Sequence, residues 1–247
     1  MPYGMYLSAA GADVQRQRIE VMSNNLANVA TPGFARQLSV IQARHAEAIE
    51  QGLASPGDGT IHDVGGGVNL VETVTDHSRG TLQPTGIPTD FALRGPGYFV
   101  VEKDGEQRLT RAGNFSLNGQ GELITQGGYK LLSEGGQPIT ITSANWRLSP
   151  NGNIDQEGLS TPLKLVKSEP GDLTRAGENL YAPLGETPAM KADERAVASG
   201  YLEMSNVSPT SQMMELIEAT RAYEANIRMI QSQDQVLGAL VTRVLKQ

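Results

Sequence analysis

The sequence contains no cysteine, and this absence excludes several kinds of chemistry at once. Without a thiol, the chain forms no disulfide, has no thiolate nucleophile and offers no thiolate to a metal ion. A chain without cysteine also suits an oxidising compartment in which no disulfide bridges are needed. Aromatic residues make up only 5% of the 247 residues, so the compact aromatic-rich core of many enzymes is not expected.

Basic residues and long apolar runs are also scarce. The chain has 20 Lys and Arg against 27 Asp and Glu, a net charge of −7, which argues against a nucleic-acid partner. No apolar run reaches the roughly 18 residues of a membrane span, so no direct membrane insertion is expected. No basic residue precedes Arg16 and the first residues are polar, so we expect no cleaved secretory signal.

Reactive constellations are missing as well. The three histidines, His45, His62 and His77, are scattered, and no pair has the i, i+4 spacing of a helical zinc site. The sequence has neither a Gly-x-Ser-x-Gly nucleophile elbow nor a GxxxxGK[ST] phosphate loop. Asp155 and Glu157 fit a solvated hairpin edge better than an acid–base pair. We therefore expect no catalytic residue, no metal and no cofactor, and a building block rather than an enzyme.

Glycine and proline are concentrated in the middle of the chain. Of 28 glycines and 13 prolines, 25 and 11 lie between residues 31 and 206. Because both residues interrupt helices, this distribution predicts helical ends around a turn-rich, strand-rich middle. The predicted fold is α+β: terminal helices paired in a coiled-coil-like bundle, with an all-β domain inserted between them. The predicted divisions are 1–33 (helix), 34–80 (extended linker or loop), 81–200 (β-rich outer domain) and 201–247 (helix).

The C-terminal segment predicts one long helix over about 209–245. Ser208 is a good N-cap residue, and Pro209 suits the first helical position. At about 1.5 Å per residue the helix would be roughly 55 Å long, so it needs a parallel companion to cover its apolar stripe. Two interleaved rows repeat every seven residues: Met213, Thr220, Ile227, Asp234 and Val241, and Leu216, Tyr223, Ile230, Leu237 and Val244.

The N-terminal segment predicts the companion. A second row beside its main apolar stripe would allow this helix to face two partners at once. The alternative is an ordinary two-helix hairpin packed on the middle domain, but a long helix at each end of one chain favours assembly. The main stripe is Ile19, Met22, Leu26 and Val29, and the second row is Leu7, Val14 and Val21.

The end of this N-terminal helix carries three asparagines, which are poor helix formers because their amides compete for backbone hydrogen bonds. A polar group in a helix seam can fix the register of packing at some cost in stability. We hypothesise that these amides set the axial register between subunits and also bond the carbonyls freed at the helix end. The alternative is a frayed helix end with asparagine caps. The residues concerned are Asn24, Asn25 and Asn28, followed by Thr31, Pro32 and Gly33, which stop the helix and turn the chain.

The middle of the chain predicts short antiparallel strands. Tight turns are indicated at Asp104-Gly105, Asn118-Gly119, Gly127-Gly128 and Asn151-Gly152. Residues 50–67 have a loop-like composition. Strands are predicted near 98–102, 107–111, 115–117, 121–125, 129–132, 137–141, 146–155 and 162–168.

Four segments resemble signatures of the bacterial flagellar rod and hook proteins, in the order found in that family. They are SNNLANVATPGF (23–34), TGIPTDFALRGPGYFVVEKDG (85–105), TRAGNFSLNGQGELITQGGYKLL (110–132) and SNVSPTSQMMELIEATRAYEANIRMIQSQDQVLGALV (205–241). The resemblance covers nearly the whole chain. A length near 250 residues is similar to a rod subunit rather than a hook protein, with the proximal-rod (FlgF-like) type first and the distal-rod (FlgG-like) type next.

The resemblance implies a structural subunit of the flagellar basal body. Such proteins are exported unfolded by the flagellar type III apparatus without signal cleavage, and polymerise with copies of themselves and neighbouring rod and hook proteins into the drive shaft that crosses the periplasm. The terminal helices would lie in the inner core and the β domain outside. Two other classes compete: an enzyme acting on a periplasmic polymer would need a pocket with paired carboxylates, and a secreted β-rich binding module would need no helical seams.

Overall fold

The computed structural model describes residues 3–45, 49, 51–53, 55 and 65–244. These residues divide into two compact units. The helical unit comprises the described parts of Met1–Ala27, Gln37–Asp76 and Ser208–Gln247, and the β-rich unit comprises Asn28–Arg36 and His77–Val207. Two helices near the ends and a β-rich middle make the chain an α+β protein, as predicted.

The helical unit contains α1 (Tyr3–Ala27) and α3 (Pro209–Val244). The long helix α3 begins at the proline that the sequence indicated. The first helix, in contrast, ends at Ala27, so Val29 and the residues up to Gly33 lie in a turn rather than in the helix. The turn forms because Thr31 donates its backbone N–H to the Asn28 carbonyl at 3.1 Å and its hydroxyl to Asn28 Oδ1 at 3.2 Å.

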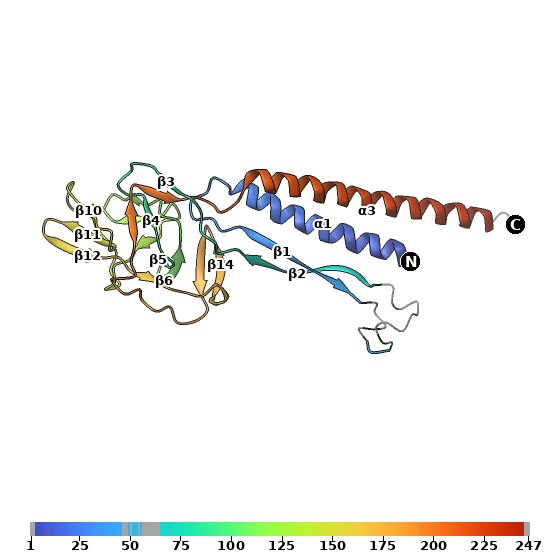
Figure 1. Ribbon diagram of the computed structural model, residues 1–247, viewed down its shortest axis with the longest axis horizontal. Coiled ribbons are helices and arrows are strands. Elements are labelled where there is room, and N and C mark those ends of the chain that lie inside the picture. Colours follow the sequence, from blue (N-terminus) through green and yellow to red (C-terminus); the bar gives the residue numbers. More distant parts are fainter. Residues whose placement is uncertain (1–2, 46–48, 50, 54, 56–64, 245–247) are drawn as a thin grey trace. The chain divides into compact units, whose positions relative to one another are not determined.

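α1 and α3 lie side by side and run antiparallel (Figure 1). Asn25, near the C-terminal end of α1, bonds Gln212 in the first turn of α3, whereas Gly4 in the first turn of α1 lies against Gln233. The expectation of a parallel companion within the chain is therefore corrected. An apolar repeat indicates that a helix has a partner, but it carries no information on the partner's direction.

A two-stranded antiparallel ribbon packs on α1 in the same unit. It consists of β1 (Gln37–Arg44) and β2 (Gly67–Thr75), with a register shift between Val40 and Ile41 (Figure 1). Both strands fall within 34–80, where the sequence predicted an extended linker. Their side chains are mostly exposed, so they show no clean alternation of apolar and polar residues. The predicted loop at 50–67 lies largely outside the described residues.

The β-rich unit is built around an eight-stranded sheet with the path β14-β15-β6-β5-β9-β8-β7, in which β13 also pairs with β5. Smaller sheets are β10-β11-β12, β16-β4 and β17-β3, and a short 3-10 helix, η2 (Pro170–Asp172), precedes β14. The strands are β3 (Leu82–Pro84), β4 (Phe91–Leu93), β5 (Tyr98–Lys103), β6 (Glu106–Thr110), β7 (Ser116–Leu117), β8 (Leu123–Ile124), β9 (Lys130–Leu131), β10 (Arg147–Leu148), β11 (Asn153–Gln156), β12 (Leu159–Pro162), β13 (Leu165–Val166), β14 (Leu173–Gly177), β15 (Leu180–Pro183), β16 (Val197–Ser199) and β17 (Tyr201–Glu203).

Most predicted strands are present in the β-rich unit, but the strand predicted at 137–141 is not. The hairpin between β5 and β6 turns at Asp104 and Gly105, whose φ angles of 54° and 83° are both positive, as a tight hairpin turn requires. Residues 137–141 form only isolated bridges, among them Leu132 with Pro138, because a proline has no N–H to donate to a continuous ladder. The main core packs Phe91, Phe99, Leu131 and Ile154, with the single tryptophan, Trp146, at its edge.

Candidate assembly surface and the polar clamp of the β-rich unit

The long helix α3 exposes an unusual number of large apolar side chains. On one helix, seven such residues are each more than half exposed, with values from 51% to 64%. Single exposed apolar residues are normal, whereas seven of them on one helix are an unusual amount of apolar surface to leave in water. The residues are Met213, Met214, Ile217, Met229, Val236, Leu240 and Val241.

The two predicted rows of α3 have different surroundings. Leu216, Tyr223, Ile230 and Leu237 are all half-buried. In the other row, Met213, Thr220 and Val241 are exposed, as is Asp234, while Ile227 is half-buried. Val244 ends the helix, and its side chain is outside the described part.

A polar row with the same seven-residue spacing faces α1. Gln212 bonds Asn25, Asn226 lies against Gly11, and Gln233 lies against Gly4. Ala219, which is 1% exposed, completes the spacing. Apolar spacing in the sequence does not indicate this row, because amides and alanine do not contribute to an apolar repeat. Its spacing in the sequence was the signal that could have found it.

The predicted stripe of α1 is mainly covered within the chain. Met22 is buried, and Ile19 and Leu26 are half-buried. Val29 is half-buried in the turn that follows the helix. Of the second predicted row, Val14 is buried and Leu7 and Val21 are half-buried.

The three asparagines occupy three different environments. Asn24 is exposed, and Asn28 is half-buried in the turn after α1. Asn25 is 1% exposed, and its Nδ2 donates to the Gln37 carbonyl at 2.8 Å and to Gln212 Oε1 at 3.1 Å. The Gln37 N–H donates to Asn25 Oδ1 at 2.8 Å. This amide therefore ties α1 to both β1 and α3 inside one chain, while a role of the asparagines between subunits stays a prediction.

Gly33, at the predicted helix stop, is required for steric reasons. Its φ is +67°, and a Cβ added there would lie 2.3 Å from the backbone nitrogen of Ala112. Its N–H donates to the Glu203 carbonyl at 2.8 Å. Thr31 and Pro32 before it are half-buried, and Pro32 accepts a hydrogen bond from the Asn179 amide at 3.2 Å. The Thr-Pro-Gly stretch thus fastens the turn to the β-rich unit.

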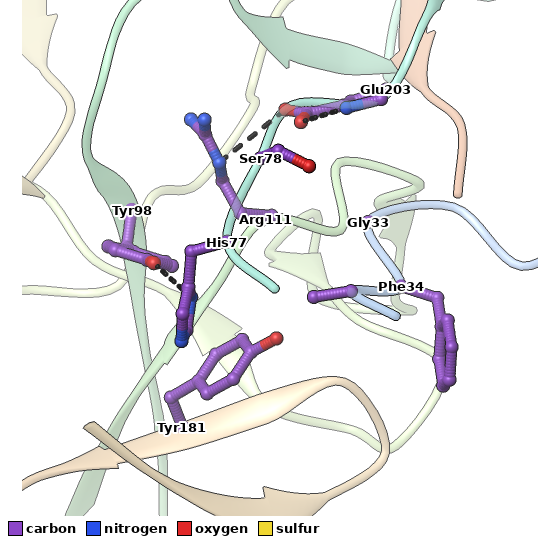
Figure 2. A pocket seen from close by; sticks show the side chains of 10 residues that line it. Gly33, Phe34, His77, Ser78, Tyr98, Arg111, Tyr181 and Glu203 are labelled. Carbon is purple, nitrogen blue, oxygen red and sulfur yellow. Dashed lines mark hydrogen bonds and ion pairs between the residues drawn. The ribbon is translucent and has the colours of Figure 1, made fainter. Parts of the chain in front are cut away.

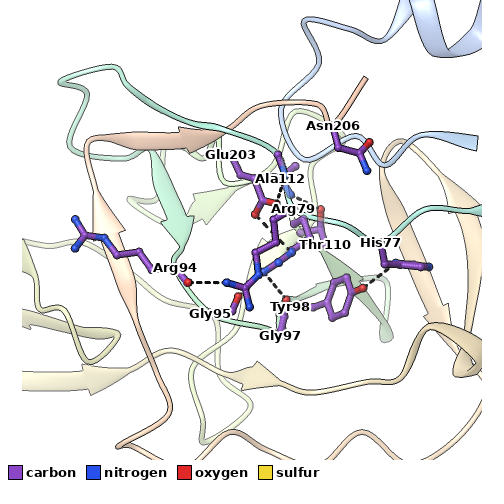
Figure 3. A network of polar contacts seen from close by, with 12 residues as sticks. His77, Arg79, Arg94, Gly95, Gly97, Tyr98, Thr110, Ala112, Glu203 and Asn206 are labelled. Carbon is purple, nitrogen blue, oxygen red and sulfur yellow. Dashed lines mark hydrogen bonds and ion pairs between the residues drawn. The ribbon is translucent and has the colours of Figure 1, made fainter. Parts of the chain in front are cut away.

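The carboxylate of Glu203 lies in a network of polar contacts in the β-rich unit (Figure 3). We call the group formed by Glu203, Arg111 and the backbone that they bind the polar clamp. Glu203 Oε1 accepts the Gly80 N–H at 3.1 Å, and Oε2 lies 3.5 Å from Arg111 Nε. Arg111 Nη1 also donates to the carbonyls of Gly95 and Gly97, each at 3.0 Å. Burial raises the pKa of Glu203 above its ordinary value, although the charge of Arg111 and the Gly80 bond act in the opposite direction.

Asn206 adds a second group of polar contacts in the β-rich unit. Its Nδ2 donates to the Ser78 carbonyl at 3.0 Å and to the Ser78 hydroxyl at 3.1 Å. Its Oδ1 accepts the Arg36 N–H at 2.7 Å. Segments near residues 36, 78 and 206, far apart in the sequence, are therefore tied together by one amide. No motif in the sequence indicated this arrangement.

An aromatic cluster of His77, Tyr98 and Tyr181 lies beside the polar clamp (Figure 2). His77 Nδ1 and the Tyr98 hydroxyl are 3.0 Å apart, and the rings of Tyr98 and Tyr181 pack with centroids 5.7 Å apart. Burial raises the pKa of Tyr98 to about 12. The cavity at this place, which Arg111 and Glu203 also line, holds only about 20 Å³, about the size of a water molecule. It is too small for a substrate.

Two kinds of feature are absent from the described residues. No group of three or more metal-type side chains was found there. Within the same part of the chain, neither helix has the combination of length and apolar character that a bilayer crossing requires. The arrangement is that of a structural subunit, with a fastened β-rich body and a helix pair that leaves apolar side chains uncovered.

Comparisons with known proteins agree with this class. Residues 5–34 match the family model for the flagella basal body rod protein, residues 92–159 that for the flagellar hook protein FlgE/F/G D1 domain, and residues 198–243 that for the flagellar basal body rod FlgEFG protein C-terminal region. The chain is similar to the flagellar basal-body rod protein FlgG of Caulobacter vibrioides, with 34% identity covering 94% of this chain and 95% of the relative.

Two further relatives extend the comparison. The FlgG rod protein of Buchnera aphidicola from Schizaphis graminum is 32% identical, over 96% of this chain and 97% of its own. The FlgF rod protein of Caulobacter vibrioides is 29% identical, over 100% of this chain and 99% of its own. The chain therefore belongs to the flagellar rod and hook family. It is a structural protein of the flagellar basal-body rod, not an enzyme.

Proposed function

We propose that this subunit polymerises with copies of itself and with neighbouring rod and hook proteins through the exposed apolar face of α3, forming the drive shaft that crosses the periplasm and transmits torque. The observation that carries the proposal is the set of seven large apolar side chains on α3, each more than half exposed. Membership of a family of rod proteins supports other family subunits as the partners that cover these side chains.

The energetics favour a polymer over a simple pair. Full burial of one large apolar side chain contributes about 1.5–3 kcal/mol. Association costs about 4–15 kcal/mol in lost translational and rotational freedom. A neighbour that covers only two or three of the seven side chains gains little net free energy. Stable association therefore needs several neighbours around each α3, which is the situation inside a helical shaft.

The pattern along α3 supports a coiled-coil-like bundle. The row that begins at Leu216 is half-buried, and the row that begins at Met213 is mostly exposed. Together the rows form a stripe that is wider than one partner covers, so a helix of another subunit would complete the seam. The predicted α1 residues Ile19, Met22 and Leu26 would take part by holding α3 in place.

We further propose that the chain reaches the rod through the flagellar type III export apparatus without cleavage of a signal peptide. Membership of the flagellar rod and hook family supports this route. The proximal-rod, FlgF type is the first candidate because the FlgF relative aligns over 100% of this chain and 99% of its own length. The FlgG type, represented by relatives of higher identity, is the second. Labelling the β-rich unit in isolated basal bodies distinguishes a position near the membrane from one near the hook.

Substitution of charged residues on the exposed face tests the main proposal. We expect Ile217→Glu and Val236→Glu to abolish incorporation into basal bodies and swimming in cells without the wild-type copy. Gln231→Glu introduces the same side chain at an exposed polar position of α3 and is the matched control. Export is measured separately from the amount of secreted subunit. Normal incorporation of both charged variants would refute the proposed surface.

A further inference from the structure

We propose that four facing pairs of residues determine the register of α1 against α3 within one subunit. In three pairs a small residue lies opposite a large one, and in the fourth two amides bond each other. We call these pairs the ladder and each pair a rung. The ladder consists of Gly4 with Gln233, Gly11 with Asn226, Arg18 with Ala219, and Asn25 with Gln212. This inference concerns the folding of a single chain and does not depend on the proposed polymer.

The two glycines are the only ones in α1, and they lie seven residues apart. Glycine is the least favourable helix former other than proline, so its presence twice on the side of α1 that faces α3 requires a reason. A Cβ at Gly4 would lie 2.9 Å from Gln233 Nε2, and a Cβ at Gly11 would lie 3.1 Å from Asn226 Oδ1. Each glycine therefore makes room for one amide side chain.

The pairs Asn25 with Gln212 and Arg18 with Ala219 fit the same register. Asn25 Nδ2 donates to Gln212 Oε1 at 3.1 Å, and both side chains are buried. The two residue numbers add up to 237 in each of the three observed pairs, so the same antiparallel register places Ala219 opposite Arg18. A small residue thus faces a large one at three rungs, and two amides bond each other at the fourth.

A slip of the helices by one heptad would spoil the match in either direction. In one direction Gly11 would face Ala219, leaving a gap, and Arg18 would face Gln212. In the other direction Arg18 would face Asn226. Asn25 would lie opposite Ala219 and would lose its hydrogen bond to Gln212. Leucine or valine at these positions would pack almost equally well in each of these registers. The small and polar residues are the ones that distinguish them.

Disulfide trapping measures this register directly because the chain has no cysteine of its own. The full-length chain carrying Gly11→Cys and Asn226→Cys should form an intrachain disulfide under mild oxidation at high dilution. A one-heptad slip moves a residue by about 10.5 Å along the axis, beyond the roughly 7 Å reach of a disulfide between Cα atoms. The pairs Gly11→Cys with Ala219→Cys and Gly11→Cys with Gln233→Cys should therefore remain reduced.

A size swap at a different rung tests whether the ladder determines the register. Gly4→Gln in the 11–226 reporter should cause loss of the crosslink, because two glutamines then meet at one rung. Adding Gln233→Gly should restore the crosslink. Gly238→Gln is the control, since a Cβ there meets no atom within 4 Å, and it should leave the crosslink unchanged. Equal trapping of all three cysteine pairs, trapping mainly between chains, an unaffected Gly4→Gln reporter or failure of the swap to restore it would overturn the proposal.

Discussion

Gly33→Ala tests the fastening of the turn after α1 to the β-rich unit. The substitution forces an L-residue into a φ of +67° and places its Cβ 2.3 Å from the Ala112 nitrogen. The positive φ costs about 1–2 kcal/mol. The contact cannot be relieved by a side-chain rotation, because the atom it meets belongs to the backbone. The turn must move away, which breaks the 2.8 Å hydrogen bond from Gly33 to the Glu203 carbonyl, a loss of about 1–3 kcal/mol for buried groups. We expect a total destabilisation of about 2–5 kcal/mol.

The matched control for this substitution is Gly105→Ala. Gly105 has a φ of +83°, but a Cβ there meets nothing within 4 Å, so only the cost of the positive φ applies. Urea unfolding is followed through the fluorescence of Trp146, the single tryptophan, which packs at the edge of the main core. The unfolding free energy of Gly33→Ala should be lower than that of Gly105→Ala by about 2 kcal/mol or more. Equal values for the two variants would refute the reasoning.

Three further predictions concern buried polar groups. Glu203→Ala removes the carboxylate that neutralises the buried Arg111 guanidinium and leaves the Gly80 N–H without its acceptor, so it should destabilise the β-rich unit by about 3 kcal/mol in urea unfolding, with Glu203→Gln milder; equal effects would contradict this. The raised pKa of Tyr98 means that the folded state favours the neutral phenol, so the contribution of Tyr98 to stability should be fully present below pH 10 and be lost as the pH rises towards about 12; Tyr98→Phe should weaken that alkaline fall, measured as the unfolding midpoint against pH. Asn25→Leu combined with Asn28→Leu should impair assembly and swimming, and normal motility would refute a role of these amides in register.

Local turn chemistry and apolar spacing account for the parts of the fold that were predicted from the sequence. Asp104-Gly105 specifies its own hairpin because both residues tolerate positive φ, and Pro209 marks the start of α3 because proline suits the first helical position. These signals lie within a few neighbouring residues. The row containing Leu216 and Tyr223 was likewise visible as an apolar repeat.

The parts that were not predicted depend on residues far apart in the chain. Glu203 and Arg111 are buried together although no local pattern relates them, and the long ribbon β1–β2 is too exposed to show alternation. The direction of α3 against α1 also has no signature in an apolar repeat. For Asn25, the sequence indicated that the amide matters, but its partners, Gln37 and Gln212, followed only from the fold.

We propose that the exposed apolar side chains of α3 become part of a core only when neighbouring subunits cover them. Hydrogen exchange across residues 213–244, compared between a proven monomer and isolated rods, tests this claim most directly. We expect fast exchange in the monomer, because the exposed apolar side chains leave α3 weakly held, and strong protection in rods. Strong protection of this segment in the monomer, unchanged in rods, would contradict the account.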